Sequence, residues 1–465
     1  MILSLPSSSH RQGTTHTVGS FHLIDHWFEV PATHGLALSL GMDAALEHPF
    51  AKQTLTIFAR EVINVSPELT TSVDERPLMV YLQGGPGGKS PRLLSDQGWV
   101  QELSKTHRLV LLDQRGTGLS TAFTAQTIQQ GRSIEQQVAY CELFRADSIV
   151  ADAEVVRRFL CAGRKDQRWS TMGQSYGGFL TLSYLSFVPE SLKDSRMTAG
   201  LAPLRASIDQ VYQSTLDRVY ERNEQFYQWY PEDEELARRV ASFVEENEVY
   251  LPSGERLTVP RFQMLGQYLG GNSRVHGLHY LLESAFAEGT SHLSAQFLSE
   301  AEQVLSFRSS PLYALLHESI YADGPAQGGS PSPAPTNWSA ARMAKKRPEF
   351  SPDASRILFT GEHIFPWLFE QDTALKPLAE LADALAQKDD WGPLYSHEQL
   401  ASNEVPLAAA AYTPDIYVDY AHSMSTAQWV KNTKVWTSHT HHHDGLGTDG
   451  TLILGHLKNL LADMR

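Results

Sequence analysis

Short, uninterrupted apolar runs constrain the fold of this 465-residue chain more than any other feature. Leu78–Leu82 (LMVYL) and Leu109–Leu112 (LVLL) lack the apolar–polar alternation of a strand with one solvent-facing side. Such runs are typical of strands buried on both faces, as in a parallel sheet. A helical spacing of apolar residues over 147–161 follows, and then a short strand at Trp169–Met172 precedes a helix over Tyr176–Phe187. Strands that alternate with helices predict an α/β fold with a mostly parallel central sheet.

The pattern changes after about Leu204. Ser207 and Gln210 form a capping-box pattern that opens an amphipathic helix, and charge-rich helical segments continue to about Tyr321. The strand pattern returns at Val405–Tyr412 and Val435–His439, and a closing helix is expected after them. The sequence therefore predicts a helical insertion that interrupts an α/β core.

We place the boundaries of these parts by the change in pattern. The first part of the core is expected over 1–204, a mainly helical cap insertion over 205–400, and the last part of the core over 401–465. Residues 1–20 are polar and are expected to form a loose arm, and the Gly/Pro/Ser-rich stretch 324–337 is expected to form a loop.

Charge and cysteine content exclude several classes of function. The chain carries 38 basic and 53 acidic residues, a net charge of -15, so binding to a phosphate backbone is not expected. An acidic field favours cationic ligands such as a peptide amine, although net charge serves mainly solubility. Two cysteines make neither a disulfide framework nor a zinc ribbon. With no signal-peptide pattern and no long apolar stretch, a cytoplasmic protein without a membrane partner is expected, its oligomeric state undetermined.

One pentapeptide carries a nucleophile in a defined context. Gly173-Gln174-Ser175-Tyr176-Gly177 matches G-x-S-x-G and lies between a predicted strand and a predicted helix. This is the setting of the nucleophile elbow of α/β-hydrolases, where a sharp turn lifts the serine hydroxyl out of the sheet. The alternative is a tight turn before a helix without catalytic meaning.

A serine nucleophile needs a base and an acid that orients the base, in the chain order Ser, Asp or Glu, His. Asp415 follows the predicted strand VPLAAAAY, with Asp419 as its rival, and His443 follows the next strand. The rival bases are His439, His441 and His442. A metal site in this histidine-rich stretch is less favoured, because adjacent histidines on one loop lack a defined ligand geometry. We therefore expect no metal and no cofactor.

Two further turns follow the buried strands. Gln83–Gly88 (QGGPGG) suits an oxyanion hole, whose candidate donors are the backbone N–H groups of Gly85 and Tyr176. A phosphate-binding loop is disfavoured because the spacing of glycines and lysine does not match. In the next turn, Asp113 and Arg115 are expected to form an ion pair that braces the site, with direct substrate contact as the alternative.

Taken together, GGPGG, DQRGTGLS, GQSYGG, AGLAPL, TGEHIFPWLFEQ, DWGPLY, PDIYVD and HHDGL resemble the proline iminopeptidases, in particular their longer bacterial subgroup. The resemblance begins near residue 24 and covers most of the chain. It implies an α/β-hydrolase fold with Ser175 as nucleophile, Asp415 as acid and His443 as base. The chain departs from many relatives at Gln83, where histidine is common, and in the histidine-rich stretch before His443.

An aminopeptidase must also bind a protonated N-terminal amine, which carboxylates do through charge-assisted hydrogen bonds. The resemblance implies such glutamates in the insertion, and the candidates are Glu283, Glu318 and Glu362, each set in an apolar or aromatic run. The alternative for each is a surface charge or ion pair. Phe365 and Trp367 are candidates for an apolar slot that holds a pyrrolidine ring, or else belong to the core.

The expected activity is release of an N-terminal residue, preferentially proline, from short peptides through an acyl-enzyme. The alternatives are another serine hydrolase on this fold, such as an esterase or a tripeptidyl aminopeptidase, a non-catalytic binding protein, and a metal-dependent peptidase that uses the histidine cluster. The requirement for a free amine separates the first group from the expected activity, because an esterase would also cleave blocked substrates.

Overall fold

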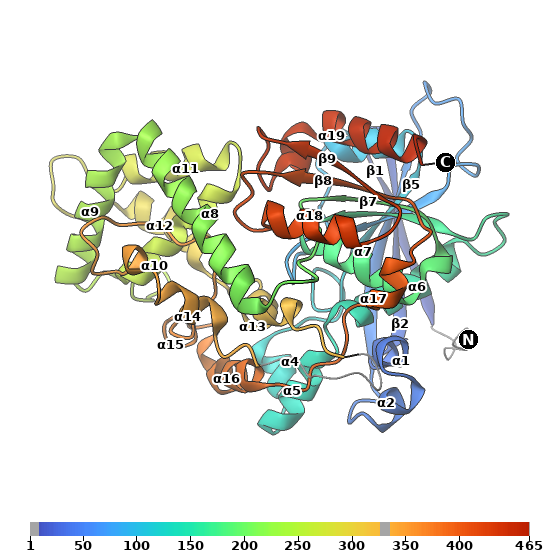
Figure 1. Ribbon diagram of the computed structural model, residues 1–465, viewed down its shortest axis with the longest axis horizontal. Helices are drawn as coiled ribbons and strands as arrows, with labels where there is room; N and C mark the ends of the chain where they lie inside the picture. The colour runs from blue at the N-terminus through green and yellow to red at the C-terminus, as the bar shows by residue number, and fades with distance from the viewer. Residues whose placement is uncertain (1–8, 326–334, 465) are drawn as a thin grey trace.

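The computed structural model describes residues 9–325 and 335–464, and in these ranges nine strands form one sheet (Figure 1). The strand order is β1-β2-β3-β5-β4-β6-β7-β8-β9. The pairs β1–β2, β2–β3 and β3–β5 are antiparallel. The remaining pairs in the series, from β5–β4 to β8–β9, are parallel. The strands are β1 (His10–Val18), β2 (Phe21–Pro31), β3 (Thr54–Asn64), β4 (Leu78–Leu82), β5 (Arg108–Asp113), β6 (Trp169–Gln174), β7 (Leu192–Thr198), β8 (Leu407–Tyr412) and β9 (Thr433–Ser438).

The central strands are buried on both faces, as their apolar runs predict. In β4, Val80 packs into one hydrophobic cluster and Tyr81 into the cluster on the other face of the sheet. The neighbouring β5 divides in the same way, with Leu112 on the first face and Leu111 on the second. The prediction of an α/β fold with a mostly parallel sheet is confirmed.

Helices cover both faces of this sheet. On one face α3 (Gly98–Ser104) packs against α19 (Gly445–Ala462), and on the other α6 (Ala146–Leu160) packs against α7 (Tyr176–Phe187). The other helices encoded before β7 or after β8 are α1 (His34–Ser39), α2 (Met42–Glu47), α4 (Ala125–Gln129), α5 (Ile134–Glu142), the short 3₁₀ helix η1 (Pro189–Ser191) and α18 (Tyr420–Trp429).

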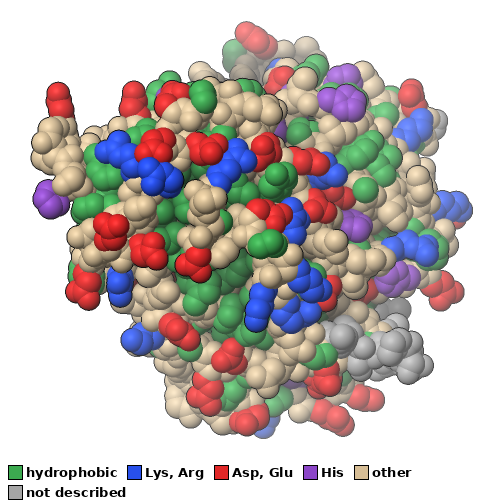
Figure 2. Space-filling view, turned by 60° about the vertical axis from the view of Figure 1, so that its left-hand side comes forward, with side chains coloured by type: hydrophobic (Ala, Val, Ile, Leu, Met, Phe, Trp, Pro, Cys, Tyr) green, Lys and Arg blue, Asp and Glu red, His purple; other side chains and the backbone are tan. Residues whose placement is uncertain are grey.

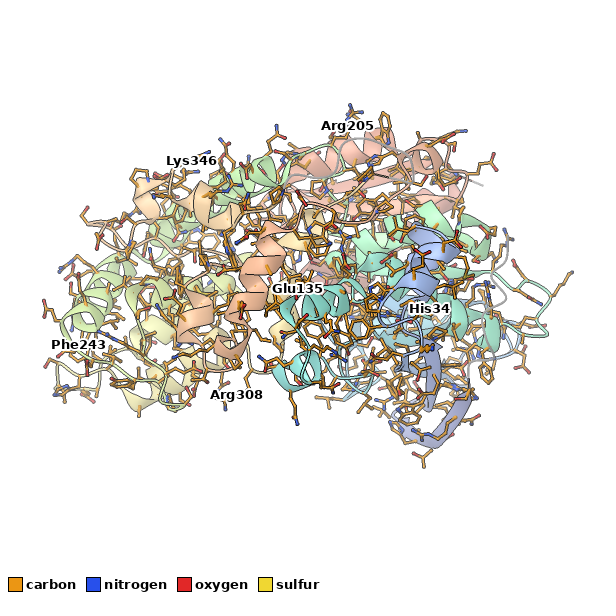
Figure 3. All side chains as sticks on the ribbon, turned by 90° about the horizontal axis from the view of Figure 1, so that it is seen from below. His34, Glu135, Arg205, Phe243, Arg308 and Lys346 are labelled. Carbon is orange, nitrogen blue, oxygen red and sulfur yellow. The ribbon has the colours of Figure 1, made fainter. Side chains whose placement is uncertain are left out.

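A helical cap lies between β7 and β8 in the chain and beside the sheet in space (Figure 1). Figure 3 shows Phe243 of the cap at the far end of the molecule from His34 of the core. The helices of this segment are α8 (Ile208–Trp229), α9 (Pro231–Glu246), α10 (Val259–Gln263), η2 (Met264–Gly270), α11 (Arg274–Glu283), α12 (Ala295–Leu305), α13 (Pro311–Leu316), η3 (Glu318–Tyr321), α14 (Ser339–Ala344), η4 (Pro348–Phe350), α15 (Leu368–Gln371), η5 (Lys376–Leu378), α16 (Ala379–Gln387) and α17 (His397–Ala401).

The two ends of the insertion have clear structural marks. The Ser207 side chain accepts a hydrogen bond from the backbone N–H of Gln210 and the Gln210 side chain accepts one from the N–H of Ser207, so the predicted capping box is present. At the other end α17 packs against α7, so the chain has returned to the core by His397.

One sequence expectation is wrong in its described part. Residues 10–18 do not form a loose arm but the edge strand β1, which pairs with β2. This strand is mostly polar and exposed, so backbone hydrogen bonding and not a buried face holds it in place, and periodicity gave no signal for it. Residues 1–8 and most of the predicted loop, 326–334, lie outside the described residues, while 324, 325 and 335–337 are irregular.

The described surface carries acidic and basic side chains side by side, with apolar patches between them on the face shown in Figure 2. Throughout 9–325 and 335–464, every helix is too short or too polar to cross a bilayer.

Candidate active site

Ser175 lies at a sharp turn between β6, which ends at Gln174, and α7, which begins at Tyr176. Its backbone has φ 56° and ψ -126°, a conformation that residues other than glycine rarely adopt. A Cβ added at Gly173 would lie 2.3 Å from the carbonyl oxygen of Gly177, and one at Gly177 would lie 1.9 Å from that of Leu82. Both glycines are thus required by close backbone approach, and the G-x-S-x-G segment has the geometry of a nucleophile elbow.

Asp415 and His443 meet beside the carboxyl ends of β8 and β9. The Nδ1 atom of His443 lies 2.8 Å from Oδ2 and 3.1 Å from Oδ1 of Asp415, whose residue is 1% exposed. The backbone N–H groups of Tyr417 and Val418 also donate to Oδ1, so the carboxylate is fixed from two sides. An ionised carboxylate can only accept, so Nδ1 carries the proton and Nε2 is left to accept one from a nucleophile.

Several nearby charges act on His443. Burial by itself lowers its pKa, but the charge and hydrogen bond of Asp415, followed by the charges of Glu362 and Asp444, outweigh burial and raise the pKa above its ordinary value. A base with this environment is held ready to take a proton and to be stabilised as the imidazolium.

Three of the four rival residues have other partners, and the fourth, His442, is buried. Asp419 is the N-cap of α18, and its side chain accepts from the backbone N–H groups of Ala421 and His422. His439 contacts the Thr413 hydroxyl, and His441 contacts the Ser438 hydroxyl. Burial lowers the pKa of His442 to about 4. The structure brings Asp415 and His443 together and gives Asp419, His439 and His441 other partners, while Nδ1 of His442 is buried without a hydrogen-bond partner among the described residues.

The serine turn, the glycine-rich loop and the histidine loop converge. Gln174, next to Ser175, donates from Nε2 to the carbonyl oxygen of His443 over 3.4 Å. A Cβ added at Gly84 would lie 2.9 Å from the Cβ of Ser175, so the loop after β4 runs directly against the serine. Tyr176 is the first residue of α7, where backbone N–H groups have no partner within the helix. Tyr176 therefore follows Ser175 at a helix start, and the loop that contains Gly85 runs beside the serine; their N–H groups stay a prediction for the oxyanion hole.

The expected ion pair between Asp113 and Arg115 is wrong. Asp113 pairs with Arg92 and accepts from the N–H of Ser90, which anchors the glycine-rich loop to β5. Arg115 pairs with Asp152 at 2.6 Å, and both side chains are fully buried. Asp113 at the end of β5 and Arg115 in the turn that follows it each have their counter-charge on another segment of the chain.

Glu362 is the candidate glutamate whose charge acts on His443. Its Oε2 accepts a hydrogen bond from the Tyr313 hydroxyl at 2.7 Å, and its Oε1 lies 3.7 Å from Nε2 of His317. Burial raises its pKa, but His317, the charge of His443 and the Tyr313 hydroxyl reverse this and lower the pKa below its ordinary value. The side chain remains 25% exposed, so an ionised carboxylate near the base can be reached by a ligand.

The other two candidate glutamates lie in different surroundings. Glu318 is buried and accepts a hydrogen bond from the backbone N–H of Ala340 at 2.9 Å, which ties η3 to α14. Burial raises the pKa of its carboxyl group. Glu283 is exposed at the end of α11, where its charge acts on Asp233 of α9.

Phe365 and Trp367 stack on one another with ring centroids 5.6 Å apart. They line a surface hollow of about 560 Å³ together with residues of α14 and η4 and Pro260. Ser175, Asp415 and His443 are not among the residues that line this hollow, so the two rings wall a different space from the one around the base.

In the described part of the chain, one group of potential metal ligands lies close together. Glu232, Asp233 and His279 of the cap have ligand atoms within 4.8 Å of one another. Asp233 and His279 are joined by a hydrogen bond of 2.9 Å, which accounts for much of this proximity. The histidine-rich loop does not form such a group among the described residues.

Comparison with known proteins identifies the family. Residues 77–229 match the family model of the alpha/beta hydrolase fold. A proline iminopeptidase of Aeromonas sobria is 38% identical over 96% of this chain and 98% of its own length. A proline iminopeptidase of Aspergillus aculeatus is 36% identical over 88% of this chain and 90% of its own length. The chain belongs to the proline iminopeptidase family.

Two solved structures that this member of the proline iminopeptidase family resembles are more distant in sequence. A proline iminopeptidase-related protein of Thermus thermophilus is 15% identical with a TM-score of 0.37, over 88% of this chain and 96% of that one. Acetyl xylan esterase 1 of a Thermoanaerobacterium species is 10% identical with a TM-score of 0.41, over 98% of this chain and 89% of that one.

Three residues at the site of this proline iminopeptidase family member escaped sequence reasoning. Tyr313 and His317 hold Glu362, and Tyr417 places its ring edge on His443 with centroids 4.9 Å apart. Tyr417 lies within the PDIYVD motif, two residues after Asp415, and this position was the available signal. Tyr313 and His317 lie four residues apart, on one face of a helical turn, and only the fold shows that this face meets residue 362.

Proposed function

We propose that this chain is a serine aminopeptidase that releases an N-terminal residue, preferentially proline, from short peptides. The observation that carries the proposal is the Glu362 carboxylate held beside the Asp415–His443 pair in a chain of the proline iminopeptidase family. A cationic amine bound at Glu362 would place the first peptide carbonyl, and no later one, near the base.

The chemistry proceeds through an acyl-enzyme. His443 accepts the proton of the Ser175 hydroxyl, and the serine oxygen attacks the carbonyl carbon of the N-terminal residue. The backbone N–H groups of Gly85 and Tyr176 stabilise the resulting oxyanion. The C–N bond then breaks as His443 donates the proton to the leaving amine, which leaves the acyl-enzyme. Water, deprotonated by His443, attacks the ester carbonyl, and the bond to the serine oxygen breaks as His443 returns the proton to Ser175. Asp415 keeps Nδ1 protonated and stabilises the imidazolium.

Glu362 selects the free amine by charge. Its carboxylate is ionised at neutral pH, because its pKa is lowered, and a protonated N-terminus can donate a charge-assisted hydrogen bond to it. An N-acylated substrate carries no such charge and would leave the carboxylate without its partner. The Glu362 side chain comes from the cap, which also covers this end of the sheet and favours short peptides over folded proteins (Figure 1).

Of the three candidate glutamates, Glu362 is proposed to bind the amine, whereas Glu318 and Glu283 are proposed to serve the structure of the cap. Phe365 and Trp367 stay an untested prediction for the apolar slot, and the hollow that they line, which does not include Ser175, Asp415 or His443, does not support it. A cytoplasmic location also stays a prediction, supported by two buried free thiols, Cys141 and Cys161.

The deciding experiment compares a prolyl arylamide that has a free amine with its N-acetylated twin. The proteins are the wild type, Ser175→Ala, Glu362→Gln, and Glu283→Gln as a matched control on the exposed end of α11. We expect the wild type and Glu283→Gln to cleave only the free form, Ser175→Ala to be inactive, and Glu362→Gln to lose most of kcat/KM for the free form.

Three outcomes would contradict the proposal. Equal cleavage of the blocked substrate by the wild type would indicate an esterase or an endo-acting hydrolase. Preference for a tripeptidyl arylamide over the prolyl arylamide would indicate a tripeptidyl aminopeptidase. An unchanged kcat/KM in Glu362→Gln would remove Glu362 from amine binding.

A further inference from the structure

Asn272 connects the cap to the loop that carries the catalytic histidine. It lies between η2 and α11, and it makes hydrogen bonds to residues on both sides of His443. Its Nδ2 donates to the carbonyl oxygen of Thr440 at 2.7 Å, and its Oδ1 accepts from the N–H of His442 at 2.7 Å. Its own backbone N–H donates to Oδ1 of Asp444 at 2.9 Å. The histidine loop is therefore held at three points by one cap residue.

Asparagine suits this position because the loop presents one acceptor and one donor. The Thr440 carbonyl only accepts and the His442 N–H only donates, so one carboxamide satisfies both and has its orientation fixed. An aspartate of the same shape would keep the bond from His442 but would face the Thr440 carbonyl and the Asp444 carboxylate with a negative charge.

The cap holds Asn272 in turn. The buried guanidinium of Arg222 in α8 donates to the carbonyl oxygens of Leu269 and Gly271, both at 3.0 Å. A Cβ added at Gly271 would lie 2.6 Å from Oδ2 of Asp444, so this segment packs closely on the histidine loop. A continuous set of contacts thus runs from the long cap helix to the backbone around His443.

The other restraints on His443 come from the core. Asp415 fixes one ring nitrogen, and the bond from Gln174 to the His443 carbonyl is long at 3.4 Å. Thr440 is exposed, so without Asn272 its part of the loop would exchange a fixed partner for water. A shift of about 1 Å in a catalytic group can cost on the order of a hundredfold in rate.

We propose that Asn272 is a positioning residue, which orients His443 toward Ser175 through the loop backbone and so makes the activity of the base depend on the seating of the cap. This inference rests on the proposed function for the identity of the base. It assigns to the cap a part in the chemical step, in addition to covering the site.

The test measures two reactions of Asn272→Ala. The first is cleavage of the free-amine prolyl arylamide, with kcat and KM determined separately. The second is the rate at which diisopropyl fluorophosphate phosphorylates Ser175, a reaction that needs an activated serine but neither proline nor an amine. We expect kcat and the labelling rate to fall together by about 10- to 100-fold, with KM nearly unchanged. The isosteric Asn272→Asp is expected to lose as much.

Asn223→Ala is the matched control. Asn223 of α8 also makes three hydrogen bonds with its side chain, to Val219 and Phe359, and all of them stay within the cap. We expect this variant to be less stable to heat while its labelling rate stays within twofold of wild type. Asn247→Ala, at an exposed asparagine bonded to Phe243, serves as a milder control.

The outcomes separate the two proposals. A folded Asn272→Ala with wild-type kcat and labelling rate, or a change in KM alone, would overturn the positioning role. Failure of both Asn272 variants to fold would also overturn it, in favour of a purely structural role. If the wild type ignores prolyl arylamide but is labelled, the proposed substrate fails and the labelling comparison still decides the role of Asn272. If the wild type resists labelling, Ser175 is not activated and both proposals fall.

Discussion

Tyr313 donates its phenolic hydrogen to Oε2 of Glu362 across 2.7 Å, while His317, one helical turn further on, lies 3.7 Å from the other carboxylate oxygen. These two partners, together with the charge of His443, keep the Glu362 pKa below its ordinary value although burial alone would raise it. The carboxylate is therefore charged at neutral pH and raises the pKa of His443, and we propose that it also binds the incoming amine.

Removing the hydroxyl group of Tyr313 should weaken the binding of the substrate amine by the Glu362 carboxylate. We expect Tyr313→Phe to lower kcat/KM for the free-amine prolyl arylamide about tenfold, because a hydrogen bond to a charged group is worth about 1.5–3 kcal/mol and His317 remains in place. Steady-state kinetics measures this. Tyr280→Phe, at a cap tyrosine that is 63% exposed, should match the wild type. Equal kinetics in both variants would show that Tyr313 does not support Glu362.

Neutralising Glu362 should shift the pH profile toward acid. His443 must be neutral to act as a base, so kcat/KM falls as the pH drops through its pKa. Burial lowers the pKa of His443, but Asp415 and Glu362 raise it by more, so the pKa lies above its ordinary value. Removing one of these negative charges lowers the pKa, and Glu362→Gln should retain its own maximal activity to a lower pH than the wild type. The check is the acidic limb of kcat/KM against pH; a limb that stays in place or moves to higher pH would contradict the electrostatic account.

Substitutions of Asp415 and Asp419, the two aspartates after β8, should have different effects, the first on activity and the second on stability. Asp415→Asn should reduce kcat about ten-thousand-fold, because an amide no longer fixes the productive tautomer of His443. Asp419→Ala should leave kcat within about twofold but lower the free energy of unfolding by about 1 kcal/mol, because it removes the N-cap of α18. Both variants are tested by steady-state kinetics and chemical denaturation. A large loss of kcat in Asp419→Ala with little loss in Asp415→Asn would make Asp419 the catalytic acid.

The buried pair of Arg115 and Asp152 should be important for stability. Arg115 also donates to the carbonyl oxygens of Ala32 and Leu143, so its loss removes a donor from both carbonyls and leaves the buried Asp152 carboxylate with His34 in place of a cationic partner. We expect Arg115→Met to lower the free energy of unfolding by about 3–5 kcal/mol, measured by urea denaturation. Arg238→Met, at the exposed pair with Glu235, should leave the midpoint unchanged. A midpoint for Arg115→Met equal to that of the wild type would show that neighbouring groups fully compensate.

Chelation should not affect the activity. Among the described residues, the histidine-rich loop forms no group of potential metal ligands, and His439 contacts Thr413 while His441 contacts Ser438. Dialysis against EDTA should therefore leave kcat for the prolyl arylamide unchanged. Loss of activity that returns on addition of Zn²⁺ would support a metal-dependent mechanism instead.

Local patterns in the sequence determined the central sheet and the serine turn. The strand Leu78–Leu82 and the helix Tyr176–Phe187 have the predicted bounds. An apolar run and a helical spacing of apolar residues are local patterns that can be recognised in the sequence itself. The elbow at Ser175 follows from glycines at two positions where a side chain would collide with backbone. The edge strand β1 escaped prediction, because its side chains are polar and its stability comes from pairing with β2.

The sequence by itself thus determined which residues could be nucleophile, acid and base, because each follows a strand of a sheet whose carboxyl ends share one edge. Only the tertiary structure decided which glutamate faces His443, which ion pairs Asp113 and Arg115 form, and that Asn272 holds the histidine loop. The physical reason is distance along the chain. Tyr313, Glu362 and His443 meet through the packing of the cap on the core, and no local periodicity records a contact between segments so far apart.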